Sequence, residues 1–165
     1  MALKGKTALI TGSTSGIGLG IAEGFAVQGT NLILNGFGDA GEIEQLRRRL
    51  ETKFGVTVLY DGADMSKPDQ VDAMVRRGVE RFGAIDVLVN NAGIQHVAPI
   101  DDFPVAKWDA ILAINLSSNF HAIRAALPAM KNAAGAGSST SPPHTRWLPR
   151  HISRRTSRPS MAWRA

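Results

Sequence analysis

Three glycines near the N-terminus have the spacing of a turn that binds phosphate groups. They lie in residues 11–18, which read TGSTSGIG. Gly12 permits a tight turn, Gly16 lets the backbone approach a pyrophosphate, and Gly18 allows a following helix to pack closely. The free N–H groups and positive end of that helix would face the phosphates. A purely structural turn is the alternative, but a position between a strand and a helix favours phosphate binding.

The residues around this turn predict alternating strands and helices. Apolar runs predict strands at residues 7–10, 31–34, 56–60 and 85–89. Helical spacing predicts helices at residues 16–28, 42–54, 68–82 and 108 to about 131. In the first of these helices, Ile17, Ile21 and Phe25 form the expected inward face. Apolar strands that alternate with helices predict a parallel sheet covered on both faces. We therefore expect an α/β, Rossmann-like, doubly wound fold, of which residues 1–131 supply the N-terminal half.

Residues 132–165 differ in composition from the rest of the chain. They contain four of the eight prolines, two of the three tryptophans and no acidic residue. No strand or helix period continues through them. We expect a basic tail, rich in proline, serine and arginine, that is disordered or poorly packed.

The net charge of +5 comes from this tail, which has six arginines. Without the tail the chain is close to neutral, so a basic surface on the folded part is not expected. A nucleic-acid-binding protein that acts through the tail is therefore the least favoured alternative.

The composition argues against several other classes of protein. The chain has no cysteine, which excludes disulfides and thiolate metal sites, and we expect no metal. No apolar run approaches the length that a membrane helix needs. The N-terminal residues lack the apolar stretch and cleavage site of a signal peptide. A cytoplasmic protein is the expectation.

The Gly-x-x-x-Gly-x-Gly spacing resembles the short-chain dehydrogenase/reductase family, and further residues resemble it in the same order. Asp64 follows the third strand, where the family contacts adenine, and Asn90-Asn91-Ala92-Gly93 follows the fourth strand. Asn115 matches the asparagine that kinks the long helix and holds a water in the proton relay. The cofactor contacts that the resemblance implies are Gly12, Thr14, Ser15, Gly16, Ile17, Gly18, Phe37, Asp64, Asn91, Ala92 and Gly93.

Each of these residues also has an ordinary structural interpretation. Asp64 could cap a turn, Asn90 and Asn91 are common turn formers, and Asn115 could be a tolerated polar residue in a helix. The agreement of several matches in the right order favours the family.

The end of the second predicted strand bears on the choice between NAD and NADP. Residues 35–39 offer no arginine or lysine to receive a 2′-phosphate, so NAD is the expected cofactor. An acid that binds the ribose hydroxyls is also missing at the strand end. Asp39 lies four residues beyond Asn35, and its role is left open.

Within the family, residues 34–39, 60–64, 91–96 and 102–111 resemble the bacterial D-3-hydroxybutyrate dehydrogenases. The resemblance implies hydride transfer between NAD and a 3-hydroxy acid, interconverting D-3-hydroxybutyrate and acetoacetate. It also implies that Gln95 binds the substrate carboxylate, with a polar loop residue as the alternative. Members of the family form homotetramers through the long helix and a later one, so the assembly of this chain is open.

The residues that the family uses for catalysis are absent from this sequence. The family deprotonates the alcohol with a tyrosine whose pKa is lowered by a lysine four residues later. The single tyrosine is Tyr60, Asp64 stands four residues after it, and no lysine follows Lys131. We expect this chain to be inactive, and a catalytically dead dinucleotide-binding module is the alternative function.

The tail has a possible origin in the gene. Codons can be chosen for residues 156–165 so that a one-base regrouping encodes YVAAKHGVAG, which contains the family's Tyr-x-x-x-Lys. Met161 and Trp163 have a single codon each, and with Ala162 between them they force the glycine that follows histidine in the regrouped frame. Our hypothesis is that a nucleotide was lost near Asn132 and that residues 132–165 are a frameshifted translation. An evolved basic tail is the alternative.

Overall fold

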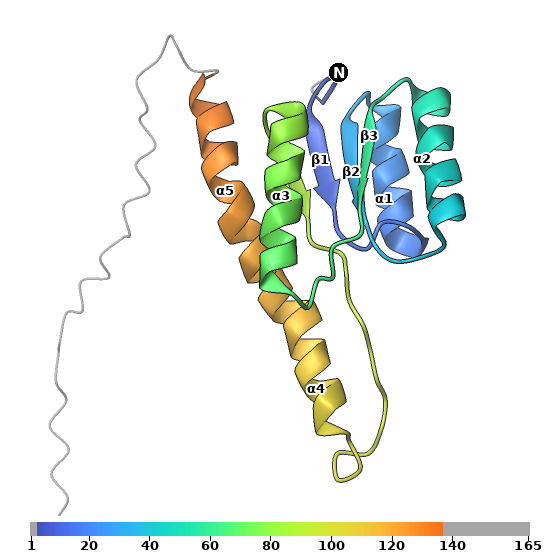
Figure 1. Cartoon of the computed structure of the whole chain (residues 1–165), viewed down its shortest axis with the longest axis vertical. Coiled ribbons are helices and arrows are strands. Elements are labelled where there is room, and N and C mark those ends of the chain that lie inside the picture. Colours follow the sequence, from blue (N-terminus) through green and yellow to red (C-terminus); the bar gives the residue numbers. More distant parts are fainter. Residues whose placement is uncertain (1–2, 137–165) are drawn as a thin grey trace, which may run out of the picture.

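The computed structural model describes residues 3–136, which form a parallel sheet with helices on both faces (Figure 1). The predicted alternation of strands and helices is confirmed. The elements in chain order are β1 (Thr7–Ile10), α1 (Gly16–Val27), β2 (Asn31–Asn35), α2 (Ala40–Phe54), β3 (Val58–Asp61), α3 (Pro68–Phe82), β4 (Val87–Val89), α4 (Val105–Leu112), a π-helical turn (Ala113–Ser117) and α5 (Ser118–Ala136). The tail was predicted to begin at residue 132, but residues 132–136 form the last turn of α5. The remainder of the predicted tail, residues 137–165, lies outside the described residues.

The strand order creates a crevice at one edge of the sheet. The described strands follow the order β3-β2-β1-β4, and every pair is parallel. The chain first adds strands on one side of β1 and then crosses to the other side to place β4. Ligands of such sheets bind outside the carboxyl ends of the strands, where the order reverses. That point lies between the ends of β1 and β4.

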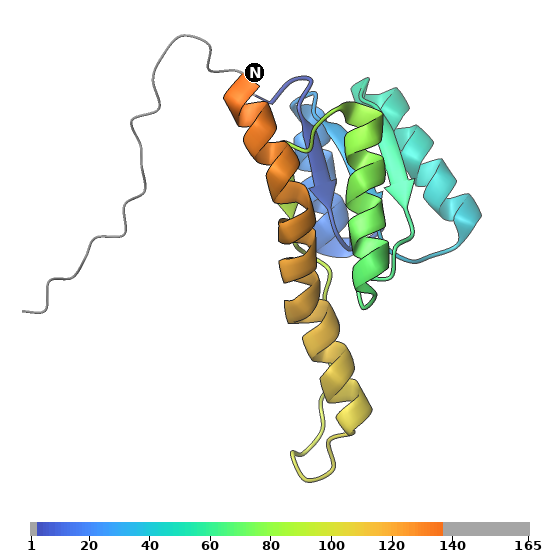
Figure 2. The same cartoon turned by 60° about the vertical axis from the view of Figure 1, so that its left-hand side comes forward.

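The two faces of the sheet carry separate apolar cores, because side chains alternate along each strand. Leu9 and Ile33 face α3 and α5, and pack with Met74 of α3. Ile10 and Leu34 face the opposite side, where α1 and α2 cover them. Figures 1 and 2 show these two helical layers on either side of the strands.

The inward face of α1 differs from the sequence prediction. Ile17 is 78% exposed, whereas Gly18, Ala22 and Ala26 are buried. The small side chains face the sheet because they let the helix axis approach it closely. The prediction was therefore wrong for Ile17, whereas Ile21 and Phe25 are half-buried and pack against this core as predicted.

The long C-terminal helix of the described residues is continuous through α4, the π-helical turn and α5. It begins at Val105 and ends at Ala136, so it is longer at both ends than the sequence predicted. α5 packs against α3, while α4 projects beyond the sheet (Figure 2). None of the helices in residues 3–136 combines the length and hydropathy needed to span a bilayer.

Candidate dinucleotide site

A cavity of about 310 Å³ lies at the carboxyl ends of the strands. Its lining combines the glycine-rich turn, the segment after β2, the segment after β3 and the segment after β4. The lining residues are Gly12, Thr14, Ser15, Asn35, Gly36, Phe37, Ala63, Asp64, Met65, Asn91, Ala92, Gly93, Ile94 and Ile114. Eight of the residues predicted to contact a cofactor are among them. Gly16, Ile17 and Gly18 are not, and they form the adjoining first turn of α1.

The three glycines of the turn differ in how much space surrounds the position that a Cβ would take. Gly12 has φ +63, and a Cβ there would lie 2.8 Å from the Cα of Ala92. A Cβ on Gly18 would collide with the carbonyl oxygen of Gly12. Gly16 has φ +56, yet its added Cβ would meet nothing within 4 Å. Gly12 and Gly18 therefore serve close packing within the protein, whereas the space around Gly16 is open.

The N-terminus of α1 adjoins this open space. The helix begins at Gly16, and Ser15 precedes it in an extended conformation without a side-chain capping hydrogen bond. The first N–H groups of a helix have no partner within the helix and carry the positive end of its dipole. This end of α1 is suited to an anionic group such as a pyrophosphate.

Hydrogen bonds tie the glycine-rich turn to the end of β4. The Thr11 hydroxyl accepts from the backbone N–H groups of Asn91 and Ala92, each at 3.0 Å. The side-chain amide of Asn91 donates to the carbonyl oxygens of Thr11 and Gly12, each at 2.9 Å. Asn91 therefore braces the turn as well as lining the cavity. The side-chain oxygen of Asn90 is buried and accepts no hydrogen bond from the described residues.

Asn35 joins three strand ends and was missed as a site residue. Its side-chain oxygen accepts from the N–H of Gly12 at 3.3 Å. Its amide group donates to the carbonyl oxygens of Asp61 and Ala63, at 3.0 and 2.9 Å. The available sequence signal was a polar residue at the end of the strand, directly after the apolar run of residues 32–34.

Asp64 both lines the cavity and caps a turn. One carboxylate oxygen accepts from the backbone N–H and the hydroxyl of Ser66, at 2.8 and 2.7 Å. These hydrogen bonds hold the pKa of Asp64 below its ordinary value, so the carboxylate is ionised at neutral pH. Asp64 therefore caps a turn, as its structural interpretation proposed, and also lines the cavity. Its contact with adenine stays a prediction.

Asp39 caps the N-terminus of α2 in the structure. One oxygen of its carboxylate accepts from the N–H groups of Gly41 and Glu42, at 2.8 and 3.0 Å, which caps the start of α2. Gly36 stands directly after β2, and a Cβ there would lie 2.5 Å from the hydroxyl oxygen of Thr14. A carboxylate side chain therefore has no room at this point. The cavity lining among the described residues includes no lysine or arginine.

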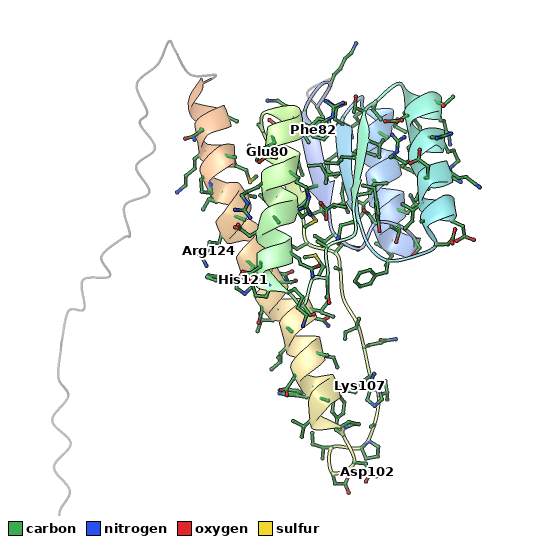
Figure 3. The ribbon with its side chains drawn as sticks, in the orientation of Figure 1. Glu80, Phe82, Asp102, Lys107, His121 and Arg124 are labelled. Carbon is green, nitrogen blue, oxygen red and sulfur yellow. The ribbon has the colours of Figure 1, made fainter. Side chains whose placement is uncertain are left out.

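Asn115 connects the π-helical turn to the segment after β4. Its amide group donates to the carbonyl oxygen of Ile94, and its side-chain oxygen accepts from the N–H of the same residue. Gln95 follows directly but is exposed and does not line the cavity. The loop then runs away from the sheet, and Figure 3 shows Asp102 at its far end and Lys107 on α4.

Tyr60 lies on β3, and its hydroxyl donates to the carbonyl oxygen of Gly36 at 2.8 Å. Burial, with a smaller contribution from the neighbouring charge of Asp61, raises the pKa of this hydroxyl above its ordinary value. A catalytic tyrosine base requires the opposite shift. The only tyrosine of the sequence is therefore a hydrogen-bond donor to the loop after β2 and does not have the properties of a catalytic base.

The parallel sheet, its crevice and the glycine-rich turn at a helix N-terminus define a Rossmann-type nucleotide-binding domain. The chain belongs to the short chain dehydrogenase family, whose sequence pattern matches residues 6–138. It is 59% identical over 133 residues to the D-beta-hydroxybutyrate dehydrogenase of Cupriavidus necator, covering 78% of this chain and 49% of that protein. The enzyme of the same name from Rhizobium meliloti is 53% identical over 126 residues, covering 76% and 49%.

Solved structures of the family have the same fold. L-sorbose reductase from Gluconobacter frateurii, complexed with NADPH and L-sorbose, matches with a TM-score of 0.75 and 37% identity, over 79% of this chain and 49% of that one. A short chain dehydrogenase from Burkholderia cenocepacia in complex with NADP matches with a TM-score of 0.74 and 34% identity, over 78% and 52%. The chain thus spans about half the length of its curated relatives. It has the fold of oxidoreductases that bind a nicotinamide dinucleotide.

Proposed function

We propose that residues 1–131 form the NAD-binding half of an oxidoreductase of the D-3-hydroxybutyrate dehydrogenase type. The observation that carries this proposal is the cavity at the carboxyl ends of the strands. The open space at Gly16 and the uncapped start of α1 fit a pyrophosphate. A lining without lysine or arginine fits free ribose hydroxyls better than a 2′-phosphate. NAD is therefore the proposed cofactor, although the two solved relatives described above hold NADPH or NADP.

Different parts of the lining suit different parts of the dinucleotide. The segment from Ala63 to Met65 would bind the adenine, and Phe37 would border its ribose. The residues after β4, from Asn91 to Ile94, would hold the nicotinamide half. When bound there, the nicotinamide supplies the hydride chemistry. The protein's own contribution is to hold the adenosine half and the nicotinamide half of the dinucleotide at the carboxyl ends of the strands.

The proposed substrate is a 3-hydroxy acid, with D-3-hydroxybutyrate and acetoacetate as the pair interconverted. The sequence identity to two enzymes of that name supports this assignment. Gln95 is the proposed ligand of the substrate carboxylate, since it directly follows the cavity residue Ile94. Asn115 is the proposed holder of the relay water, and it already fixes the backbone of Ile94.

Assembly as a homotetramer is part of the proposal for the complete enzyme, as is a cytoplasmic location. The helix made of α4 and α5 leaves a row of large apolar side chains exposed. These are Trp108, Leu112, Leu116, Phe120, Ile123 and Leu127. Such a row is typical of a surface that is covered by another subunit.

We further propose that the 165-residue chain binds NAD without oxidising an alcohol. Its sequence contains no Tyr-x-x-x-Lys, and Tyr60 already donates to Gly36. A dinucleotide-binding module without catalysis is the alternative role that this absence favours. Residues 132–165 are proposed to be a frameshifted translation.

An activity assay on two proteins tests these proposals together. The purified chain is incubated with NAD and D-3-hydroxybutyrate, and formation of NADH is followed. A second protein is made from the gene with one nucleotide restored near the codon of Asn132. We expect turnover by the restored protein alone. Turnover by the 165-residue chain, or none by the restored protein, would contradict the proposal.

A further inference from the structure

The hydroxyl of Tyr60, on β3, forms a hydrogen bond with the loop that follows the neighbouring strand, β2. It donates to the carbonyl oxygen of Gly36, and the two strands are paired so that Tyr60 lies opposite Leu34. The hydrogen bond therefore reaches beyond the end of the β2–β3 ladder. It fixes the first peptide group of the loop that joins β2 to α2.

A second hydrogen bond fixes the next peptide group of this loop. The hydroxyl of Thr14 donates to the carbonyl oxygen of Phe37 at 3.1 Å. Gly36, whose carbonyl oxygen accepts the first of these hydrogen bonds, has φ +152, a conformation that residues with a Cβ rarely adopt. The helix cap at Asp39 then ends the loop. Residues 36–38 are thus held by β3 on one side and by the glycine-rich turn on the other.

This loop has to recognise the adenosine half of the cofactor without a charged side chain. Gly36 leaves no room for a carboxylate, and the carboxylate of Asp39 is used in capping α2. What remains toward the cavity is the backbone of the loop and the ring of Phe37, which is 70% exposed. Recognition by backbone groups and one ring depends on where the loop is held.

We infer that Tyr60 is a positioning residue for the cofactor: its hydroxyl holds the Gly36 peptide so that the loop presents its backbone and Phe37 to the adenosine half. This inference rests on the proposed binding of a dinucleotide. The hydroxyl of Tyr60 is protonated at neutral pH and so able to donate, and burial raises its pKa still further. Gly62 leaves the space that the hydroxyl occupies, since a Cβ there would lie 3.0 Å from the hydroxyl oxygen.

A purely structural role for the same hydrogen bond makes a different prediction. In that case its loss lowers the stability of the sheet but leaves the affinity of the folded protein for nucleotides unchanged. Thr30→Val is the matched control. It removes a hydroxyl that donates to the carbonyl oxygen of Leu3 at 3.1 Å, before the first residue of β2 and so at the opposite end of that strand.

The experiment compares the full chain with Tyr60→Phe, Gly62→Ala and Thr30→Val. Calorimetric titrations with NAD and with adenosine 5′-monophosphate give the dissociation constants, and thermal unfolding gives the stability. For Tyr60→Phe we expect both affinities to fall roughly three- to tenfold, the range for one lost hydrogen bond. Gly62→Ala, which displaces the hydroxyl without removing it, should weaken both affinities in the same direction. Thr30→Val should lower the melting temperature only.

The outcomes separate this inference from the proposed function. If Tyr60→Phe melts earlier but binds both nucleotides as the parent does, the bond is structural and the inference is wrong. If Tyr60→Phe does not fold, Gly62→Ala decides, and unchanged affinities there overturn the inference. If the parent chain binds neither nucleotide, the proposed function itself fails and the inference with it.

Discussion

The side chain of Asn115 forms two hydrogen bonds with the backbone of Ile94, donating to its carbonyl oxygen and accepting from its N–H, each at 2.9 Å. These two hydrogen bonds join the π-helical turn Ala113–Ser117 to the loop that follows β4. An extra residue in one helical turn changes the direction of the side chains around it. The turn therefore places Asn115 where it can pair with both backbone polar groups of one residue, Ile94.

Replacement of Asn115 by alanine should release the loop that begins at Ile94. Two hydrogen bonds are lost at an exposed position, so we expect the free energy of unfolding to fall by about 1–2 kcal/mol. Limited proteolysis should then cut within residues 94–104 faster than in the parent. Asn119→Ala is the control, since its amide donates to the Asn115 carbonyl at 3.0 Å within the helix. Equal cleavage rates in the parent and both variants would show that the pair does not restrain the loop.

Two glycines of α1 should respond oppositely to alanine. A methyl group on Gly18 would meet the carbonyl oxygen of Gly12, so Gly18→Ala should cost about 2 kcal/mol or more and abolish NAD binding. Gly20 has nothing within 4 Å of its added Cβ, so Gly20→Ala should stabilise the protein by about 0.5–1 kcal/mol. Chemical denaturation measures both effects. Similar losses for the two variants would be inconsistent with the packing described for the turn.

A cation added at Phe37 should shift the cofactor preference toward NADP. Phe37 is exposed and lines the cavity, whose lining among the described residues contains no lysine or arginine. Phe37→Arg should raise the affinity for NADP relative to NAD roughly tenfold, because the guanidinium can pair with a 2′-phosphate. Phe37→Leu controls for loss of the ring. An unchanged preference in the arginine variant would show that the 2′ position lies elsewhere.

The stability of the protein should fall at alkaline pH through Tyr60. Its pKa in the folded protein is raised above the ordinary value of 10.0 by burial and by Asp61. The folded state therefore holds this proton more tightly than the unfolded state. The stabilisation is fully present below the ordinary pKa and is lost as the pH rises through the folded pKa. Unfolding free energies measured across this range should converge for the parent and Tyr60→Phe; parallel curves would contradict the assignment.

Much of the fold follows from patterns that are local in the sequence. The central strands β1 and β2 are buried on both faces, so they carry runs of apolar residues such as residues 32–34, and these runs revealed them. The helix over residues 68–82 was predicted with its structural bounds, because proline marks its start and Val71, Met74 and Val75 mark its buried face. On α1, Ile21 and Phe25 were correctly assigned to the core-facing side. Ile17 was assigned there wrongly, because the glycine and alanines that set the closest packing carry little hydrophobic signal.

The site was only partly accessible from the sequence. Local motifs predicted the turn and the segment after β4, since their residues are contiguous. The network around Asn35 links residues from three strand ends, which the sequence separates by more than twenty positions, and no local pattern reveals it. The role of Asp39 could not be predicted from the sequence, because an aspartate can serve either as a helix cap or as a ligand of the ribose. The hydrogen bonds to Gly41 and Glu42 assign the cap.

The measurement that tests the central claim most directly is a calorimetric titration of the purified 165-residue chain with NAD, repeated with NADP. The account predicts saturable binding of NAD at one site per chain, and binding of NADP roughly tenfold weaker or more, because the described lining of the cavity offers no lysine or arginine to a 2′-phosphate. A folded chain that takes up no NAD, or that binds NADP more tightly than NAD, would contradict it.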